Sequence, residues 1–537
     1  MDFHFIIIGA GSAGCVLANR LSENPSNNVL LLEAGGADKH PYIHIPAGYS
    51  KLFKSKLDYG YFTEPQKNVL NRKIYLPRGK TLGGSSSINL MAYVRGNKAD
   101  YNDWSNMGNK GWSYKEVLPY FKKSEGNEDL NDKYHNQNGE LKVGFPKSFK
   151  TKYRQLFIDA CHEVGFEKNP DYNGEKQAGV CSFQTTVFKS KRQSTAVAFL
   201  NPIKSRKNLK ILTNAKTSKI LIEKDESIGV EVQYPNGQKQ TFLCSKEIIL
   251  SAGSYNSPQI LMLSGIGDKS ELENNKIECL KNLTGVGKNL QDHLMYPMSA
   301  ITNERDSLNH HLSLVNQVLD IGKYITSKSG ALSISPLESV AFGSSSISRN
   351  RVDYQFHFAA LSIGDKYDVD FYDIDTFPKT DGISILPTLL RPKSRGYLSI
   401  ASNHINDNPI IQPNFLDHED DLQVLLESGK KAHEVLHSTT FSKSLKQIFQ
   451  SKSISDDELI KHMLQVLETV YHPVGTCKMG SDEDAVVDEQ LRVKGIGRLR
   501  VIDASIMPSI VSGNTNAPVI MIGEKGADMI LNDHDAV

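Results

Sequence analysis

The sequence predicts an α/β protein of two domains, the first discontinuous and the second an α+β unit built on an antiparallel sheet. Three observations carry this prediction. The chain begins with an apolar run, a glycine turn and a helical pattern. Residues 295–455 contain several strand-like runs and few glycine loops. The last fifty residues again show a strand, a turn and a helix, as at the N-terminus. We therefore expect the first domain to span 1–294 and 485–537, and the second to span 295–484.

An N-terminal glycine fingerprint indicates that the first domain binds a dinucleotide. The β-branched run Phe3–Ile8 predicts a strand, the turn Gly9–Gly14 leads into a helical segment, and a second apolar run, Val29–Leu32, ends at Glu33. In this Rossmann-like pattern the glycines let a pyrophosphate approach the helix N-terminus, and the acid binds a ribose hydroxyl. The residues expected at the dinucleotide are Gly9, Gly11, Ser12, Ala13, Gly14, Glu33 and Ala34. The pattern alone leaves open NAD, FAD, or an α/β unit without a ligand.

Composition excludes several classes of function. A formal net charge of +1 over 537 residues gives no excess of positive charge that would attract nucleic acid. The six cysteines lie far apart without a CxxC pair, which predicts reduced thiols and neither a disulfide framework nor a metal site. The sequence contains no run of about twenty apolar residues, so we predict no membrane-spanning helix. Because the nucleotide fold begins at Phe3, no signal peptide is expected; we predict a cytoplasmic location, with peripheral attachment to the inner face of the cell membrane left open.

The middle of the first domain contains short strands and loops. Four alternating runs between Leu209 and Leu243 predict a small antiparallel layer, and Glu247–Ser251 a buried strand. The polar segment Glu125–Gln137 is expected to be a surface loop. The glycines of Gly285–His293 lack a strand before them and a helix after them, so we interpret this segment as a structural turn.

The second domain and the C-terminal return follow from their apolar patterns. Strands are predicted at Val352–Phe358, Gly382–Leu386 and Gly396–Ile400, and a long helix at Leu422–Leu436. A final strand, Leu499–Ile502, and a helix, Ala517–Leu531, would complete the N-terminal sheet.

Two polar stretches carry candidate chemistry. His472 precedes Pro473, which disfavours a helix and places the imidazole on a loop or a strand end. Asn514 lies in the polar turn Ser512–Pro518. A lone histidine is more often structural, but beside a redox cofactor His472 could take a hydroxyl proton and Asn514 could hydrogen-bond the developing alkoxide.

Four stretches together resemble the glucose-methanol-choline (GMC) family of flavin oxidoreductases over essentially the full length. They are the N-terminal fingerprint with Glu33, GKTLGGSSSIN from Gly79, GSYNSPQILMLSGIG from Gly253, and the two stretches around His472 and Asn514. The likeness is greatest to bacterial alcohol and choline dehydrogenases. It implies FAD rather than NAD, and it implies that His472 is the general base and Asn514 the second active-site residue.

The resemblance also implies a set of FAD contacts. A histidine that carries covalent FAD in some relatives is Ile88 here, so the FAD is expected to be non-covalent. Thr217 occupies a position, usually valine, that contacts the adenine. The implied contacts beyond the fingerprint are Ser85, Asn89, Leu90, Met91, Ala92, Thr217, Asp503, Ala504 and Thr515.

The predicted function is oxidation of a primary, aliphatic alcohol to the aldehyde by hydride transfer to flavin N5, with electrons passed to a quinone or another acceptor that is not oxygen. Glu338 matches a position that faces the substrate cation in choline-oxidising relatives, and a purely structural role for this acid stays equally open. The alternatives are a choline dehydrogenase, an oxygen-using alcohol oxidase, and a flavoprotein without catalysis.

Overall fold

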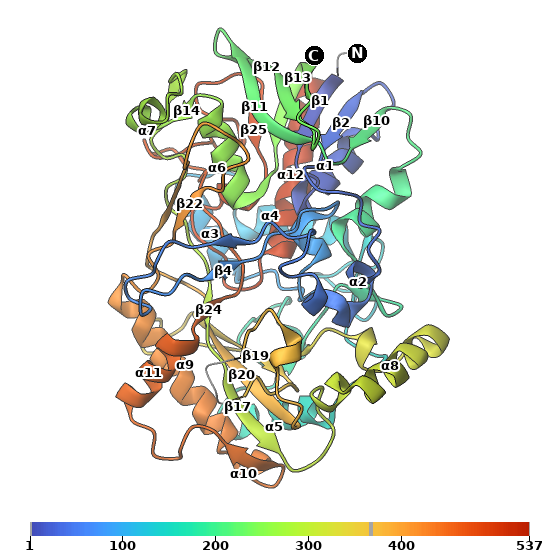
Figure 1. Cartoon of the computed structure of the whole chain (residues 1–537), viewed down its shortest axis with the longest axis vertical. Coiled ribbons are helices and arrows are strands. Elements are labelled where there is room, and N and C mark those ends of the chain that lie inside the picture. The colour runs from blue at the N-terminus through green and yellow to red at the C-terminus, as the bar shows by residue number, and fades with distance from the viewer. Residues whose placement is uncertain (1–2, 365–368, 536–537) are drawn as a thin grey trace.

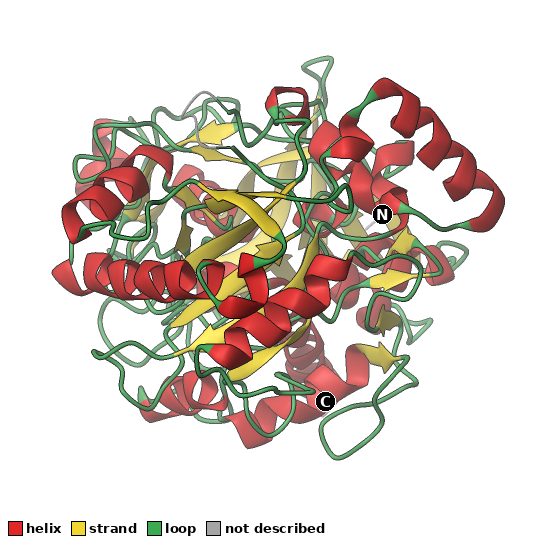
Figure 2. Cartoon of the chain, turned by 90° about the horizontal axis from the view of Figure 1, so that it is seen from below, coloured by secondary structure: helices red, strands yellow, loops and turns green. Residues whose placement is uncertain are grey.

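The computed structural model describes residues 3–364 and 369–535. Two sheets lie at opposite ends of the molecule, with both termini beside the upper one (Figure 1). Viewed from below, the strands lie in the interior and most helices lie towards the outside (Figure 2). Each sheet is packed against its own large apolar cluster of buried residues.

The upper sheet is mostly parallel at its centre. Its order is β10–β2–β1–β13–β12–β11, and β25 pairs with β13. The pairs β1–β2, β1–β13, β2–β10 and β13–β25 are parallel, whereas β11–β12 and β12–β13 are antiparallel. The bounds are β1 (Phe3–Ile8), β2 (Val29–Leu32), β10 (Leu209–Leu212), β11 (Lys216–Glu223), β12 (Glu226–Gln233), β13 (Lys239–Leu250) and β25 (Leu499–Val501). The C-terminal strand therefore completes the N-terminal sheet, as predicted.

One strand of this sheet differs from the sequence prediction. We expected Leu209–Leu212 in the antiparallel layer, but β10 instead pairs in parallel with β2, on the far edge. The side-chain amide of Asn208 donates to the carbonyl oxygens of Ser22, Asn24 and Asn27, and this contact aligns β10 with β2. The expected strands Gln240–Leu243 and Glu247–Ser251 are one continuous strand, β13.

The first and last helices pack against each other beside this sheet. These are α1 (Ser12–Leu21) and α12 (Asn516–Asp535). The buried guanidinium of Arg20 donates to both carboxylate oxygens of Glu524, at 2.8 and 2.7 Å. A buried charge needs such a partner, and this ion pair ties the C-terminal helix to the nucleotide fingerprint.

The lower sheet is antiparallel, as predicted. Its order is β23–β17–β20–β19–β18–β7, with β16 joined to β20 and β24. Helices α5 (Lys152–Glu163) and α9 (Glu419–Leu436) pack on it. The bounds are β7 (Gly179–Ser182), β16 (Leu294–Met295), β17 (Met298–Thr302), β18 (Leu337–Gly343), β19 (Tyr354–Ala359), β20 (Gly382–Leu389), β23 (Leu445–Ile448) and β24 (Glu468–Thr469). Strand β7 comes from within 1–294; the domain boundaries stay a proposal.

Two further segments differ from expectation. Glu125–Gln137 is not simply a surface loop: it begins as β5 (Glu125–Asn127), and its Glu125 and His135 are buried around Arg95. Gly396–Ile400 contributes a strand, β21 (Tyr397–Ser399), but outside the lower sheet.

The remaining elements lie outside these two sheets. Their bounds are α2 (Pro41–His44), η1 (Pro46–Lys51), β3 (Tyr61–Phe62), β4 (Tyr75–Leu76), η2 (Gly84–Ser87), α3 (Lys98–Asn106), α4 (Tyr114–Ser124), β5 (Glu125–Asn127), β6 (Leu141–Val143), β8 (Val187–Phe188), β9 (Lys191–Arg192), η3 (Ala196–Leu200), η4 (Asn201–Ile203), α6 (Gly253–Leu263), β14 (Ile266–Gly267), α7 (Lys269–Asn274), β15 (Lys281–Asn282), η5 (His310–Leu312), α8 (Leu314–Ser327), η6 (Ala331–Ser333), η7 (Ile374–Thr376), β21 (Tyr397–Ser399), β22 (Ile410–Gln412), α10 (Thr439–Ser442), α11 (Asp456–Val466) and η8 (Ala504–Ile506).

Candidate active site

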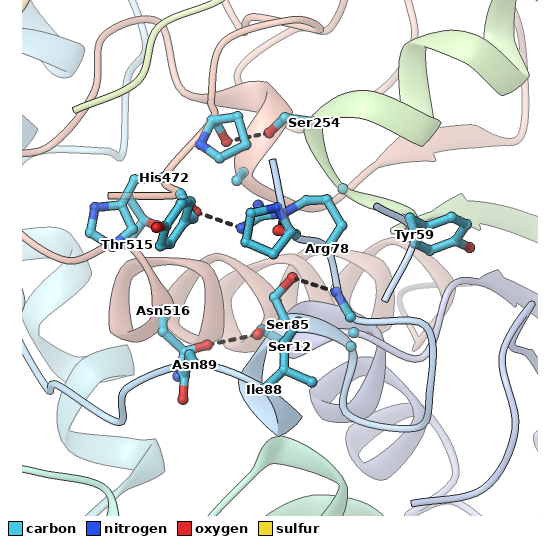
Figure 3. A pocket seen from close by; sticks show the side chains of 18 of the residues that line it. Ser12, Tyr59, Arg78, Ser85, Ile88, Asn89, Ser254, His472, Thr515 and Asn516 are labelled. Carbon is cyan, nitrogen blue, oxygen red and sulfur yellow. Dashed lines mark hydrogen bonds between the residues drawn. The ribbon is translucent and has the colours of Figure 1, made fainter. Parts of the chain in front are cut away.

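A cavity of about 310 Å³ extends from the fingerprint to the lower sheet. Around it, residues from distant parts of the chain come together, among them Ser12, Ile88 and His472 (Figure 3). Both predicted catalytic residues and nearly all predicted cofactor contacts line it: Gly9, Gly11, Ser12, Ala13, Glu33, Ala34, Ser85, Asn89, Leu90, Met91, Ala92, Thr217, Asp503, Ala504, Thr515, His472 and Asn514. Gly14 and Glu338 lie outside this lining.

The glycine turn has no room for side chains. Gly9 has φ +99°, and a Cβ there would lie 2.5 Å from the carbonyl oxygen of Ser251. A Cβ on Gly14 would lie 1.9 Å from the carbonyl oxygen of Gly9. Gly14 therefore lets α1 close on the turn rather than contacting the cavity, and the N-terminus of α1 is left facing a ligand.

Glu33 is held at the end of β2 by two backbone donors. The N–H groups of Ala10 and Gly35 donate to its two carboxylate oxygens, at 2.9 and 2.8 Å. Burial raises the pKa of Glu33 to about 7, although these donors and the charge of Lys80 oppose the shift. The acid is thus fixed in place before any ribose hydroxyl reaches it.

The glycine-serine loop packs directly on the fingerprint. A Cβ on Gly84 would lie 2.8 Å from the Cα of Gly11, so the two glycine loops meet backbone to backbone. Asn89, further along, accepts on its side-chain oxygen from the guanidinium of Arg192 at 2.7 Å and from the N–H of Met91 at 3.0 Å. Arg192 is buried, and its burial lowers its pKa to about 9. These contacts hold the amide group of Asn89 at the cavity wall.

Three buried polar atoms at the cavity have no hydrogen-bond partner within the described residues. They are Oγ1 of Thr217, Oδ1 of Asn514 and Nε2 of His357. A buried unpaired polar group costs roughly 1–3 kcal/mol, so a ligand with polar atoms that reach these groups would relieve that cost. The carboxylate of Asp503 is already used: it accepts from the N–H of Gly253 at 2.9 Å and from Oγ of Ser257 at 2.6 Å. The turn carrying Ala504 is thereby held against α6. These features fit the expected FAD.

Hydrogen bonds set the tautomer of His472. Nε2 of His293 lies 3.0 Å from the carbonyl oxygen of Leu390, and Nδ1 of His293 lies 3.0 Å from Nδ1 of His472. A carbonyl oxygen only accepts, so His293 carries its proton on Nε2 and accepts on Nδ1. His472 must then donate from Nδ1, which leaves the lone pair on its Nε2. That atom lies 3.3 Å from the amide nitrogen of Asn514.

Both imidazoles are neutral in this arrangement. Burial lowers the pKa of His293 to about 3 and the pKa of His472 well below its usual 6.5. Asp292 supports them through the backbone, since its Oδ1 accepts from the N–H groups of His472 and His293 at 2.7 and 2.8 Å. The structural-turn interpretation of Gly285–His293 therefore missed this pair. The available signal was the acid–histidine dipeptide at the end of that segment.

The cavity wall near His472 is apolar. We call it the apolar end; it consists of Met295, Ala359, Leu361, Ile363, Phe371, Phe377 and Leu386. The only carboxylates among the described lining residues are Glu33 and Asp503, both among the predicted cofactor contacts. His357 also lines the cavity. Its Nδ1 lies 3.0 Å from Oγ1 of Thr388, its Nε2 has no partner among the described residues, and burial lowers its pKa to about 4.

Glu338 faces away from the cavity. It is buried on β18, and its carboxylate accepts from the hydroxyl of Thr151 at 2.8 Å and from the N–H of the same residue at 3.3 Å. Burial raises its pKa to about 7. Because Thr151 is the residue before α5, Glu338 stabilises the start of that helix, and the proposed contact with a substrate cation finds no support here.

Sequence comparison matches two family models. Residues 3–295 match the N-terminal model of the GMC oxidoreductases and residues 392–523 match the C-terminal model. The chain belongs to the GMC oxidoreductase family. GMC oxidoreductases bind FAD, and this chain is an FAD-dependent oxidoreductase of that family.

Relatives of known name cover nearly the whole chain. An alcohol dehydrogenase [acceptor] from Pseudomonas putida is 40% identical over 99% of this chain and 96% of its own length. An oxygen-dependent choline dehydrogenase from Rhizobium johnstonii is 38% identical with the same coverage. Among solved structures, a formate oxidase from Aspergillus oryzae, studied for FAD modification, superposes with a TM-score of 0.93 at 26% identity, covering 100% of this chain and 99% of that one.

Within the described residues, no group of three or more His, Cys, Asp or Glu side chains is placed to hold a metal ion. No helix in residues 3–364 and 369–535 is long and apolar enough to cross a membrane.

Proposed function

We propose that this GMC oxidoreductase oxidises a primary, uncharged aliphatic alcohol to the aldehyde. The observation that carries the proposal is the unprotonated Nε2 of His472 facing an apolar end without a carboxylate. An alkyl chain gains free energy by leaving water for such a wall, whereas a quaternary ammonium would lack a counter-charge there.

His472 serves as the general base. Its Nε2 takes the proton of the substrate hydroxyl while the carbinol carbon gives up a hydride, and the carbon–oxygen double bond forms from the electron pair left on oxygen. Bound FAD supplies the hydride acceptor at N5. The amide nitrogen of Asn514, now 3.3 Å from Nε2 of His472, donates a hydrogen bond to the developing alkoxide.

The predicted cofactor contacts complete the proposal. The fingerprint residues would hold the pyrophosphate, Glu33 the ribose and Thr217 the adenine. The flavin and its ribityl chain would be held by Ser85, Asn89–Ala92, Asp503, Ala504 and Thr515. Ile88 lines the cavity and has no atom able to form a covalent bond to the flavin, which supports non-covalent FAD. The two electrons pass to a quinone or a similar acceptor rather than to oxygen, in the cytoplasm or at the inner face of the cell membrane.

A choline dehydrogenase is the second candidate, because the Rhizobium johnstonii relative carries that name. The two candidates differ in the charge of the substrate. The position of Glu338, on Thr151 rather than on the cavity, supports the uncharged substrate.

Anaerobic flavin bleaching separates these candidates. Purified holoenzyme is mixed without oxygen with a series of primary aliphatic alcohols and, separately, with choline. We expect the alcohols to bleach the flavin and choline to do so at least tenfold more slowly. Faster bleaching by choline would favour the second candidate, peroxide formed in air would favour an oxidase, and a flavin that no alcohol bleaches would contradict the proposal.

A further inference from the structure

Helix α8 presents an apolar stripe to solvent. Figure 1 shows α8 projecting from the side of the molecule. Six aliphatic side chains on this helix are between 50% and 80% exposed, which is unusual for one helix of 14 residues. They are Leu314, Val315, Val318, Leu319, Ile321 and Ile325.

Two polar residues of α8, Asp320 and Tyr324, face the protein instead. Asp320 is buried and its carboxylate lies 2.6 Å from Nδ1 of His311. The hydroxyl of Tyr324 donates to the carbonyl oxygen of Ser190 at 2.8 Å. These polar contacts hold the inner side of α8 against the protein, and its apolar side faces solvent.

Lysines flank this stripe. Lys323 and Lys328 are exposed on α8 and at its C-terminal cap, and Lys189 and Lys191 are exposed on the turn that Ser190 ties to the end of the helix. None of these four forms an ion pair with a described residue. Asp320, the only acid on α8, already faces inward. These four lysines therefore place positive charge beside the stripe.

We propose that α8 binds a lipid surface that contains anionic headgroups. An apolar helical face bordered by lysines is the pattern of helices that lie in the membrane interface. Each lysine near an anionic surface adds attraction, which salt screens. A second copy of this chain is the less suitable occupant, because α8 offers no exposed carboxylate that could pair with the lysines of the other copy: Asp320, its one acid, is buried.

The position of α8 suits the proposed function. The role of lipid binding in catalysis rests on that proposed function, whereas the binding itself does not. The chain runs from α8 through η6 to Pro336 and Leu337, which line the cavity. The hydroxyl of Ser335 donates to the carbonyl oxygen of Leu90, also a lining residue, at 2.7 Å. Lipid binding through α8 would bring the cavity wall close to the bilayer, where aliphatic alcohols and quinones dissolve.

Vesicle sedimentation tests the proposal without turnover, so its failure is separate from that of the alcohol oxidation. The holoenzyme is incubated with vesicles of phosphatidylcholine and phosphatidylglycerol in equal parts, and with phosphatidylcholine alone, at low and high salt. The apolar variant is Val318→Gln with Ile325→Gln, and the charge variant is Lys323→Glu with Lys328→Glu. The matched control is Leu70→Gln with Leu243→Gln, two exposed leucines far from α8 in the sequence.

We expect the wild type and the control to sediment with the anionic vesicles, and the apolar variant to bind at least tenfold more weakly. The charge variant should lose its preference for anionic over neutral vesicles, and high salt should reduce binding of the wild type. Failure of the wild type to sediment, or equal binding by the apolar variant, would overturn the proposal. So would a dimer of the wild type in sedimentation velocity that the apolar variant lacks.

Discussion

The two ends of the cavity are built by different means. The end near the fingerprint is made largely of backbone. The two glycine loops touch each other with no room for a Cβ. Glu33 is held by the N–H groups of Ala10, which lies in the glycine turn, and of Gly35, two residues further along the chain. The end near His472 is made of side chains from distant segments, with His293, His472 and Asn514 meeting through hydrogen bonds across more than forty residues of chain.

This difference has a physical cause. A phosphate group is bound by backbone N–H groups and a helix dipole, which any sequence with the right glycines can offer. A reacting hydroxyl needs a lone pair at one atom with the proton elsewhere, and only a side chain whose partners fix its tautomer provides it. Substitutions at the two ends should therefore separate cofactor binding from chemistry.

The largest effect is expected at the base. His472→Ala removes the proton acceptor, so the rate constant for anaerobic flavin reduction by an aliphatic alcohol should fall about a thousandfold, while bound FAD stays at the wild-type level. Stopped-flow absorbance measures the rate, and the spectrum of the purified protein measures the FAD. His404→Ala, an exposed histidine, is the control. A rate within tenfold of the wild type would remove His472 from the role of base.

At the other end, Gly14→Ala should act on the cofactor. The new Cβ would lie 1.9 Å from a backbone oxygen that cannot move aside easily, so the turn must open. We expect at least a tenfold weaker affinity for FAD, measured by fluorescence titration of the apoprotein. Gly322→Ala, where a Cβ meets nothing within 4 Å, should leave the affinity unchanged. Full FAD content with a lost rate would contradict the division between the two ends.

His293→Phe tests the tautomer directly, because a phenyl ring has no acceptor in the place of Nδ1. Without an acceptor on Nδ1 of His293, His472 is free to place its proton on either nitrogen, and we expect a tenfold to hundredfold slower reduction, by analogy with partners that orient metal-bound histidines. Because burial keeps the pKa of His472 below 6.5, the wild-type rate should stay level as the pH falls to 6.5, whereas the variant should lose that level profile. Unchanged rate and profile would show that the hydrogen bond has no part in the reaction.

Glu338→Gln shows whether this acid belongs to the cavity or to the fold. Burial raises the pKa of Glu338 from 4.5 to about 7, so in the window between these values the folded state holds a proton that the unfolded state has lost. The free energy of unfolding of the wild type therefore falls, by up to about 3 kcal/mol, as the pH rises through this window. The variant has no carboxyl group at this position and does not lose this stability.

Urea unfolding at pH 5 and at pH 8 measures this difference. The variant should gain stability relative to the wild type at pH 8, while its rate with alcohols stays within twofold. A large rise in the KM for choline, without a change in the KM for uncharged alcohols, would instead show that Glu338 contacts the substrate.

The smallest effect is expected at Thr217. Thr217→Val removes a buried hydroxyl without a partner in the described residues, so the apoprotein should gain about 1 kcal/mol. If that hydroxyl bonds the adenine, FAD affinity should fall about threefold. The melting temperatures of apoprotein and holoprotein should therefore move closer together, as calorimetry would show; equal shifts in both forms would exclude a bond to the cofactor.

Prediction from sequence succeeded where the pattern is local. The fingerprint, the long helix α9 and the C-terminal strand and helix follow from periodicity and glycine spacing, and the structure confirms them. It failed where distant contacts decide. Leu209–Leu212 looks like its antiparallel neighbours, but Asn208 directs it to β2; the segment after Glu125 looks like a solvated loop, yet its acid pairs with the buried Arg95.

The sequence by itself determined the cofactor class and the family, because glycine loops and short motifs act over a few residues of chain. Only the tertiary structure decided which atom of His472 carries the lone pair, because that depends on His293 and on the carbonyl oxygen of Leu390, residues that no local pattern connects. It also decided that α8 turns its aliphatic side chains outward. An amphipathic pattern tells which residues share a face, and the burial of Asp320 and Tyr324 tells which way that face points.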